Sequence, residues 1–233
     1  MAFNGLKNAF LLALLMAPSF VHAAMAVDQN IFHFESGQSP RADVQVINPD
    51  DEPLYVQVEV LEVVNPGSPE EERRLIDNPR HVDFLVTPNR FIVPAKSRKV
   101  VRLVNLGGHG DQERILRVNL KPVPPPMEAN KSGVRILVAH QLLVVVVPEQ
   151  PSSDIVATRE GERLQLKNQG NTNVLLRSGR QCASDEDLKS GSSDSCITVD
   201  TKRLYPGNVW ELADNGPVEF VVMQGEDSVR QRF

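Results

Sequence analysis

The chain has 233 residues, of which 41% are hydrophobic and 24% charged, so it can bury a core and form one large or two small domains. Its formal net charge of -5 argues against nucleic acid as a partner, because binding to phosphate backbones usually requires a basic surface.

The N-terminal segment has the features of an export signal. Lys7 provides a positive flank, apolar residues fill most of 9–21, and Val21-His22-Ala23 fits cleavage before Ala24, with Ala24-Met25-Ala26 as a second acceptable site. The run is shorter than the roughly twenty apolar residues of a bilayer-spanning helix. We therefore expect residues 1–23 to be a cleaved signal peptide and the mature chain not to insert into a membrane.

From residue 31 to residue 120 the pattern is typical of β-strands. Apolar and polar residues alternate with a period of two, as in strands with one buried face, and turn residues such as Asn48-Pro49-Asp50-Asp51 separate them. The charged run Glu70–Arg74 is predicted to be a solvated turn. The predicted strands are 31–34, 42–47, 54–60, 84–86, 90–93, 99–104 and 114–120.

The stretch from Val134 to Val147 is longer than the usual strand of about five or six residues and is apolar on both faces until Pro148 ends it. Such a strand must lie inside a sheet or offer a face to a partner. For Leu142–Val147 a buried core strand and an exposed strand are equally open. In the first half, interruptions such as Arg135 and His140 favour a strand that lends its apolar side chains to another protein.

Beyond residues 148–151 the chain continues with shorter predicted strands separated by turn signals. The near absence of a 3.6-residue period predicts an all-β fold of two β-sandwich domains. The expected domains are 24–148 and 152–233, and the predicted strands of the second are 155–158, 163–167, 174–177, 209–212 and 218–223.

Two cysteines, Cys182 and Cys196, frame a loop rich in Ser, Asp and Gly. In an exported protein this favours a disulfide bond over a metal-binding pair, because there is no CxxC spacing and no nearby histidine. The histidines are scattered, and motifs for a nucleophile, a metal or paired catalytic carboxylates are missing. The sequence therefore predicts no enzymatic activity, no metal and no cofactor.

Three segments resemble the PapD-like periplasmic chaperones of pilus assembly. They are 94–103, 113–125 and the long apolar strand ending at Pro148. The resemblance implies two immunoglobulin-like domains in a boomerang shape, a periplasmic location and no use of ATP. It also implies pilin or fimbrial subunits and an outer-membrane usher as partners, with self-association of the free protein left open.

In this family the chaperone lends its long G1 strand to an unfinished subunit, which is called donor-strand complementation. Placing the family's strand on this chain makes Val134, Ile136 and Val138 the donated face, with His140 at its end.

The two basic residues with which classical members hold the subunit's C-terminal carboxylate correspond here to Ile31 and Leu143. A carboxylate buried without a cation is costly, so another basic residue must serve. Arg117 is the first candidate, because its fork matches a carboxylate, and Arg114 is the second. For both residues a position facing solvent is the open alternative.

Arg102 and Glu113 match family positions that form an internal ion pair, which implies a structural role for them. The missing anchors, together with the cysteine pair, suggest a non-classical branch of the family, alternate or archaic. The alternative class is a secreted structural or adhesive β-sandwich protein such as a pilus subunit. A subunit would have an incomplete last domain, whereas the predicted strands here form complete sets.

Overall fold

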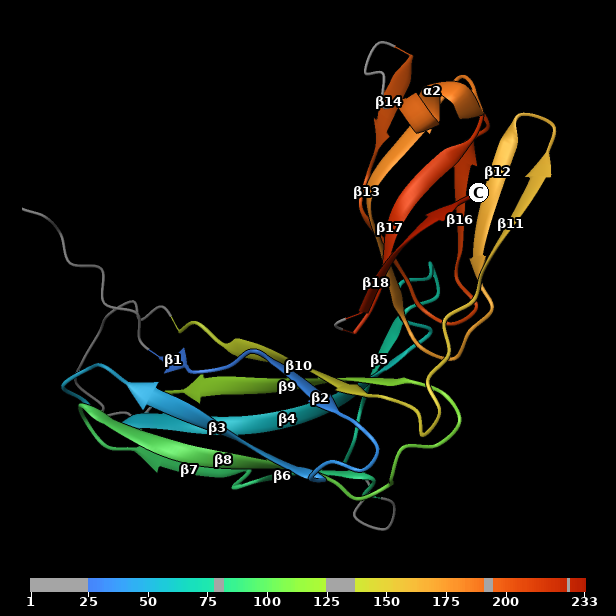
Figure 1. Ribbon diagram of the computed structural model, residues 1–233. Helices are drawn as coiled ribbons and strands as arrows, with labels where there is room; N and C mark the ends of the chain where they lie inside the picture. The colour runs from blue at the N-terminus through green and yellow to red at the C-terminus, as the bar shows by residue number, and fades with distance from the viewer. Residues whose placement is uncertain (1–24, 78–81, 125–136, 191–194, 226) are drawn as a thin grey trace, which may run out of the picture.

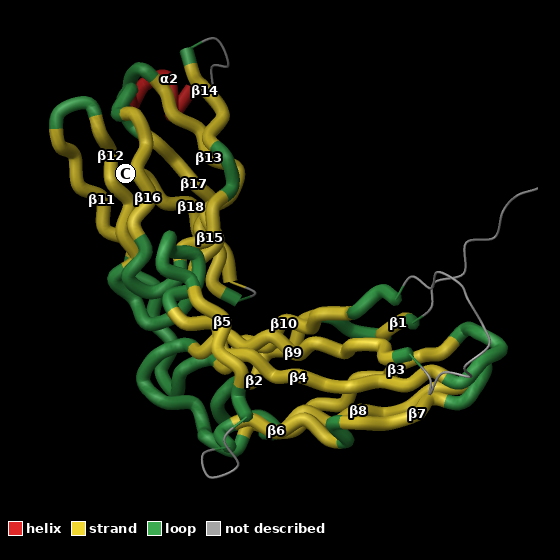
Figure 2. The backbone as a smooth tube through the Cα atoms, turned by 180° about the vertical axis from the view of Figure 1, so that it is seen from behind, coloured by secondary structure: helices red, strands yellow, loops and turns green. Residues whose placement is uncertain are grey.

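The computed structural model describes residues 25–77, 82–124, 137–190, 195–225 and 227–233. The chain forms two β domains that meet at an angle (Figures 1 and 2). The first contains the strands up to β10 (His140–Val146), and the second begins with β11 (Ile155–Glu160). The predicted fold class, all-β with two sandwich domains in an angled arrangement, is confirmed.

The first domain consists of two facing sheets. One has the strand order β1-β3-β8-β6, and the other has the order β2-β10-β9-β4-β5, with β7 paired to β4. The remaining strands are β1 (Ala26–Val27), β2 (Ile31–Phe34), β3 (Arg41–Asn48), β4 (Leu54–Val64), β5 (Glu72–Leu75), β6 (Phe84–Thr87), β7 (Arg90–Val93), β8 (Ser97–Asn105) and β9 (Arg114–Val123).

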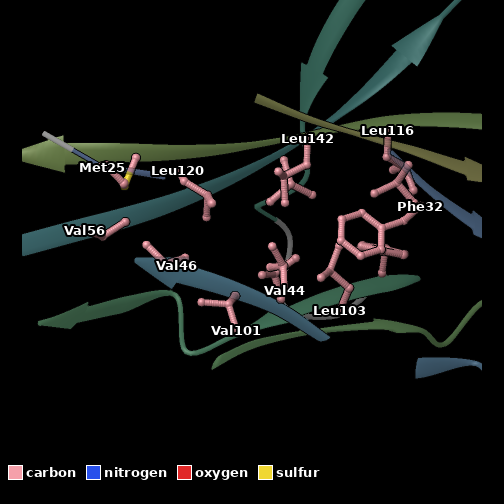
Figure 3. Packing of buried hydrophobic residues seen from close by; sticks show 14 of the residues in the cluster. Met25, Phe32, Val44, Val46, Val56, Val101, Leu103, Leu116, Leu120 and Leu142 are labelled. Carbon is pink, nitrogen blue, oxygen red and sulfur yellow. The ribbon is translucent and has the colours of Figure 1, made fainter. Parts of the chain in front are cut away.

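Period-two alternation explains the core of this domain. On β9, Leu116, Val118 and Leu120 are fully buried, whereas Arg117 and Asn119 between them point away from the core. Each fully buried aliphatic side chain contributes about 1.5–3 kcal/mol to stability. The facing sheet supplies a matching set of side chains that point toward β9 and β10 (Figure 3), namely Val44, Val46, Val101 and Leu103.

Strand β10 is apolar on both faces from Leu142 onward, with the core face fully covered and the outer face covered at Val145 but only partly at Leu143. Leu142 and Val144 point into the core, whereas Val145 on the other face packs in a small cluster that includes Tyr205 of the second domain. The second half of the predicted stretch is therefore a buried strand. Its predicted beginning at Val134 lies outside the described residues, and the described strand begins at His140.

The second domain also has two sheets around one core. Their orders are β11-β12-β16 and β14-β13-β17-β18, with β15 paired to β13. The core includes Leu164, Leu176 and Phe220, all fully buried. The strands are β12 (Arg163–Asn168), β13 (Val174–Cys182), β14 (Cys196–Val199), β15 (Lys202–Leu204), β16 (Val209–Ala213), β17 (Val218–Gln224) and β18 (Asp227–Arg232).

Cys182 and Cys196 form the predicted disulfide bond, which joins the paired ends of β13 and β14. Between them lies the short helix α2 (Asp185–Ser190). The chain's single tryptophan, Trp210, lies in this domain with its ring centroid 5.6 Å from that of Phe220. No helix in the described part of the chain is long and apolar enough to span a bilayer.

One predicted turn is shorter than expected, because Glu70 lies in a turn but a strand begins at Glu72. The run Glu70–Arg74 contains the start of β5, which pairs with β4 so that Leu75 lies opposite Leu61. All four residues of β5 are exposed, so the strand is held by main-chain hydrogen bonds and not by burial. Charged side chains on such an edge strand oppose pairing with other sheets.

Candidate functional site

One row of side chains crosses the outer face of the sheet that contains β10. Strand β2 pairs in parallel with β10, which places Ile31 beside Leu143, and on the other side of β10 Leu143 lies opposite Arg117 of β9. The row continues through Leu61 of β4 to Leu75 of β5. We call these five residues the Arg117 row, because arginine is its one charged member.

Tyr205 of the second domain covers the neighbouring part of this sheet face. Together with Leu143 it packs against a small cluster formed by Val63, Ile115 and Val145. Burial raises the pKa of the Tyr205 phenol, and the positive charges of Arg203 and Arg117 oppose that rise. The Arg117 row therefore lies beside the contact between the domains, on the inner side of the angle they form (Figure 1).

Arg117 is partly buried, and its Nε has no hydrogen-bond partner among the described residues. Its neighbours along the row, Leu143 and Leu61, offer no side-chain acceptor. A buried donor left without an acceptor costs about 1–3 kcal/mol, and an anion that accepts from it removes this cost. Because a guanidinium binds a carboxylate through two parallel hydrogen bonds, this arrangement suits one carboxylate.

Arg114, the second candidate, lies on the opposite face of β9, because it stands three positions before Arg117 and successive side chains of a strand alternate between faces. Its Nε donates to Glu62 Oε1 at 3.2 Å, and one of its terminal nitrogens lies 3.8 Å from Asp83 Oδ2. Its charge is thus balanced by two carboxylates. Between the two candidates, the geometry favours Arg117.

Two of the four predicted donor-strand residues lie in the described part of the chain. Val138 is 57% exposed, so its apolar side chain is available to a partner. His140 begins β10, and its Nε2 lies 2.9 Å from the carbonyl oxygen of Met25. Val134 and Ile136 lie outside the described residues.

The predicted ion pair between Arg102 and Glu113 is wrong. Arg102 on β8 lies opposite Asp43 on β3 and donates two hydrogen bonds to its carboxylate, at 2.7 and 2.9 Å. These bonds hold the pKa of the Asp43 carboxyl below its ordinary value. Glu113 instead faces the second domain, where it accepts hydrogen bonds from Thr172 and Asn173.

These features can be compared with known proteins. The family model described as "Pili and flagellar-assembly chaperone, PapD N-terminal domain" matches residues 24–152, which is more than half of the chain. The chain belongs to this chaperone family. The predicted resemblance to PapD-like pilus-assembly chaperones is confirmed, and the alternative of an adhesive protein or pilus subunit is not favoured.

This chaperone is similar to a CS1 fimbrial protein of Escherichia coli, with 27% identity over 210 residues that cover 86% of the chain and 84% of the relative. The crystal structure of the class 5 fimbriae chaperone CfaA aligns with a TM-score of 0.72 at 20% identity, covering 89% of this chain and 98% of that one. A chaperone–tip adhesin complex of CFA/I fimbriae biogenesis aligns with a TM-score of 0.70 at 20% identity, covering 90% and 98%. At such identities the structural matches show the fold.

Hydrogen bonds at the domain junction hold the two halves of the chaperone together. Asn171 Nδ2 donates to the carbonyl oxygens of Asp111 in the first domain and Gln150 in the linker, at 2.9 and 3.0 Å. Glu113 Oε2 accepts from Thr172 Oγ1 at 2.6 Å and from the main-chain and side-chain nitrogens of Asn173 at 3.1 and 2.6 Å. Asn171 and Glu113 therefore each join the second domain to the first.

Gly67, in the turn between β4 and β5, also touches the second domain. Its φ is +70°, and a Cβ added there would lie 2.8 Å from both Asn208 Oδ1 and Tyr205 Cδ2. We expect Gly67→Ala to push this turn away from Tyr205 and to change the angle between the domains. Small-angle X-ray scattering measures this as a changed scattering curve and radius of gyration.

Gly37→Ala is the matched control, because Gly37 has a φ of +79° and no atom within 4 Å of an added Cβ. Both variants incur the backbone cost of about 1–2 kcal/mol for a left-handed L-residue. Only the Gly67 variant meets the other domain. Identical scattering curves for the two variants would show that this contact does not set the angle.

Proposed function

We propose that this chaperone is exported to the periplasm and loses residues 1–23 there. Its domains, 24–148 and 152–233, then hold an unfinished fimbrial subunit until an outer-membrane usher takes it. The family match supports this proposal. Further support comes from relatives that are fimbrial proteins and from the matching complex of a chaperone with a tip adhesin.

The segment that leads into β10 is proposed to be the strand given to the subunit. Strand β2 accompanies β10 only from Leu143 onward, so the strand edge before that residue is not covered by β2. An extended partner can add there through main-chain hydrogen bonds while alternate side chains enter its groove. In this register Val134, Ile136 and Val138 are the donated side chains, and His140 is the last.

The position of Arg117 is the observation that carries the proposal. The two positions at which classical members place basic residues, Ile31 and Leu143, are neighbours on adjacent strands, and Arg117 is the next residue in the same row. Compared with classical members, the basic residue of this chain lies one strand further along the sheet, on β9. Arg117 therefore takes the C-terminal carboxylate of the subunit, and the leucines beside it suit an apolar side chain at that terminus.

The test is co-expression of the tagged chaperone with each candidate fimbrial subunit of its own organism. Without the chaperone the subunit is expected to be degraded or insoluble, because its groove lacks a strand. With the chaperone it is expected to be soluble in periplasmic extracts and to co-purify in a one-to-one complex. A chaperone that leaves every such subunit insoluble would contradict the proposal.

A further inference from the structure

The outer face of the second domain's β13–β17–β18 sheet carries a cluster of arginines. Strand register places them in two adjacent rows, one with Arg177, Val221 and Arg230 and the other with Arg180, Glu219 and Arg232. Their side chains point away from the core because the residues between them, such as Phe220, are buried. We call the four arginines the arginine face.

Its charge is only partly balanced. Glu219, with 12% of its side chain exposed, lies within 3.9 Å of Arg180, 3.7 Å of Arg230 and 2.9 Å of Arg232. One carboxylate thus serves three of the four arginines, so the face is positively charged, on a protein whose formal net charge is -5. This positive charge is a local exception to the acidic character of the chain.

The uncompensated charge is greatest in the row of Arg177 and Arg230. Toward the other end Asp185 of α2 lines the same cavity as Arg232, which adds negative charge there. Within the described part of the chain, the one polar contact of the Arg177 side chain is with Met223 Sδ at 3.4 Å, and 76% of the Arg230 side chain is exposed. Partly exposed Val221 lies between these arginines, so the row offers two guanidinium groups around a small apolar centre.

The location of the arginine face restricts its partner. In Figures 1 and 2, β13, β17 and β18 form the side of the second domain that overlooks β10 and β9, on the inner side of the angle. The Arg117 row lies on the sheet face that forms the other side of this angle. A flat bilayer does not reach into such an angle, whereas a protein held at the first domain does.

We propose that the arginine face is a second contact surface for the guest subunit, and that it receives an acidic patch on that subunit. This inference rests on the proposed function, because it takes as partner the protein held at β10 and Arg117. Arginine forks suit carboxylates, and complementary charge mainly accelerates association and orients the partner. The second domain thus selects for subunits that are acidic on one side.

The first test needs no subunit. The ¹⁵N-labelled chaperone is titrated with an octaglutamate peptide and with its octaglutamine counterpart, and NMR shift changes are followed. We expect changes with octaglutamate alone, centred on Arg177, Val221 and Arg230. We also expect the affinity to fall at least about fivefold in Arg177→Glu/Arg230→Glu and on raising NaCl from about 20 to about 300 mM.

Arg163→Glu is the matched control, because Arg163 is also an arginine of the second domain, 71% exposed, but on the other sheet. It should leave the peptide affinity unchanged. Scattered shift changes, or equal affinities in the wild type and the double variant, would overturn the inference. So would binding to phosphatidylglycerol vesicles that the double substitution abolishes, because that would identify a membrane as the partner.

A second test uses the co-expressed subunit. The double variant and Arg177→Gln/Arg230→Gln should still co-purify with it, but the yield of complex should fall about threefold or more, most strongly for the reversed charges. Equal yields for the wild type and both variants would contradict the role of the arginine face as a contact surface and leave the proposed function intact. Failure of the wild type to co-purify would contradict the proposed function, and the peptide titration would then still report on the arginine face.

Discussion

Replacing Val138 by glutamate is expected to abolish recovery of the soluble subunit from periplasmic extracts. In the proposed mechanism this side chain moves from water into the subunit's groove, where burial of a valine contributes about 1.5–3 kcal/mol. A carboxylate at the same place also has to be desolvated without a partner. The combined loss, of about 3 kcal/mol or more, corresponds to more than roughly a hundredfold in affinity. Co-purification with the tagged chaperone measures it.

Val209→Glu is the appropriate control, because Val209 is 49% exposed on β16, in the sheet of the second domain that faces away from the inner side of the angle. The free chaperone should fold about equally well with either substitution, since each side chain is already about half exposed. If the subunit is recovered as well with Val138→Glu as with the wild type, the segment before β10 is not the strand given to the subunit.

Arg117→Leu should have opposite effects on capture of the subunit and on the stability of the free chaperone. The substitution removes an arginine whose buried Nε has no acceptor among the described residues and continues the apolar row, so we expect equal or greater resistance to urea. The subunit's carboxylate, however, loses its cation, which costs about 2–5 kcal/mol when a buried charge pair is truncated. Urea titration of the free protein and co-purification with the subunit measure the two effects separately.

Arg114→Leu serves as the control, because its side chain lies on the opposite face of β9 and pairs with Glu62 and Asp83. That variant should still bind the subunit. Arg117→Lys keeps the charge but not the two-pronged geometry, so it should bind with intermediate affinity. Equal capture by the wild type and Arg117→Leu would contradict the anchor. The anchor would also be contradicted if Arg117→Leu reduced capture equally for the normal subunit and for a subunit whose C-terminal carboxylate is masked.

Much of the fold could be predicted because alternating burial is a local property of the sequence. Strands such as β3 and β9 have one face in the core, and their apolar residues recur with a period of two. β5 could not be recognised in this way, because its charged residues are all exposed and only hydrogen bonds to β4 define it. β18 escaped prediction for the same reason, with five of its six residues exposed.

The site was less predictable because it depends on which strands become neighbours. The resemblance pointed to Ile31 and Leu143 as separate positions, but only the pairing of β2 with β10 shows that they lie side by side. Arg102 was assigned to Glu113, although the register of β3 with β8 places Asp43 opposite it. The carboxylate and the guanidinium group of such an ion pair lie far apart in sequence, and no periodic pattern connects them.

The single tryptophan has a practical consequence for following assembly. Trp210 packs on Phe220, and Phe220 lies on β17 between Glu219 and Val221 of the arginine-bearing rows, so one layer of side chains separates the indole from that surface. The other domain has no such reporter. The indole emission of the unlabelled chaperone therefore arises from its second domain alone, one layer of side chains beneath the arginine face.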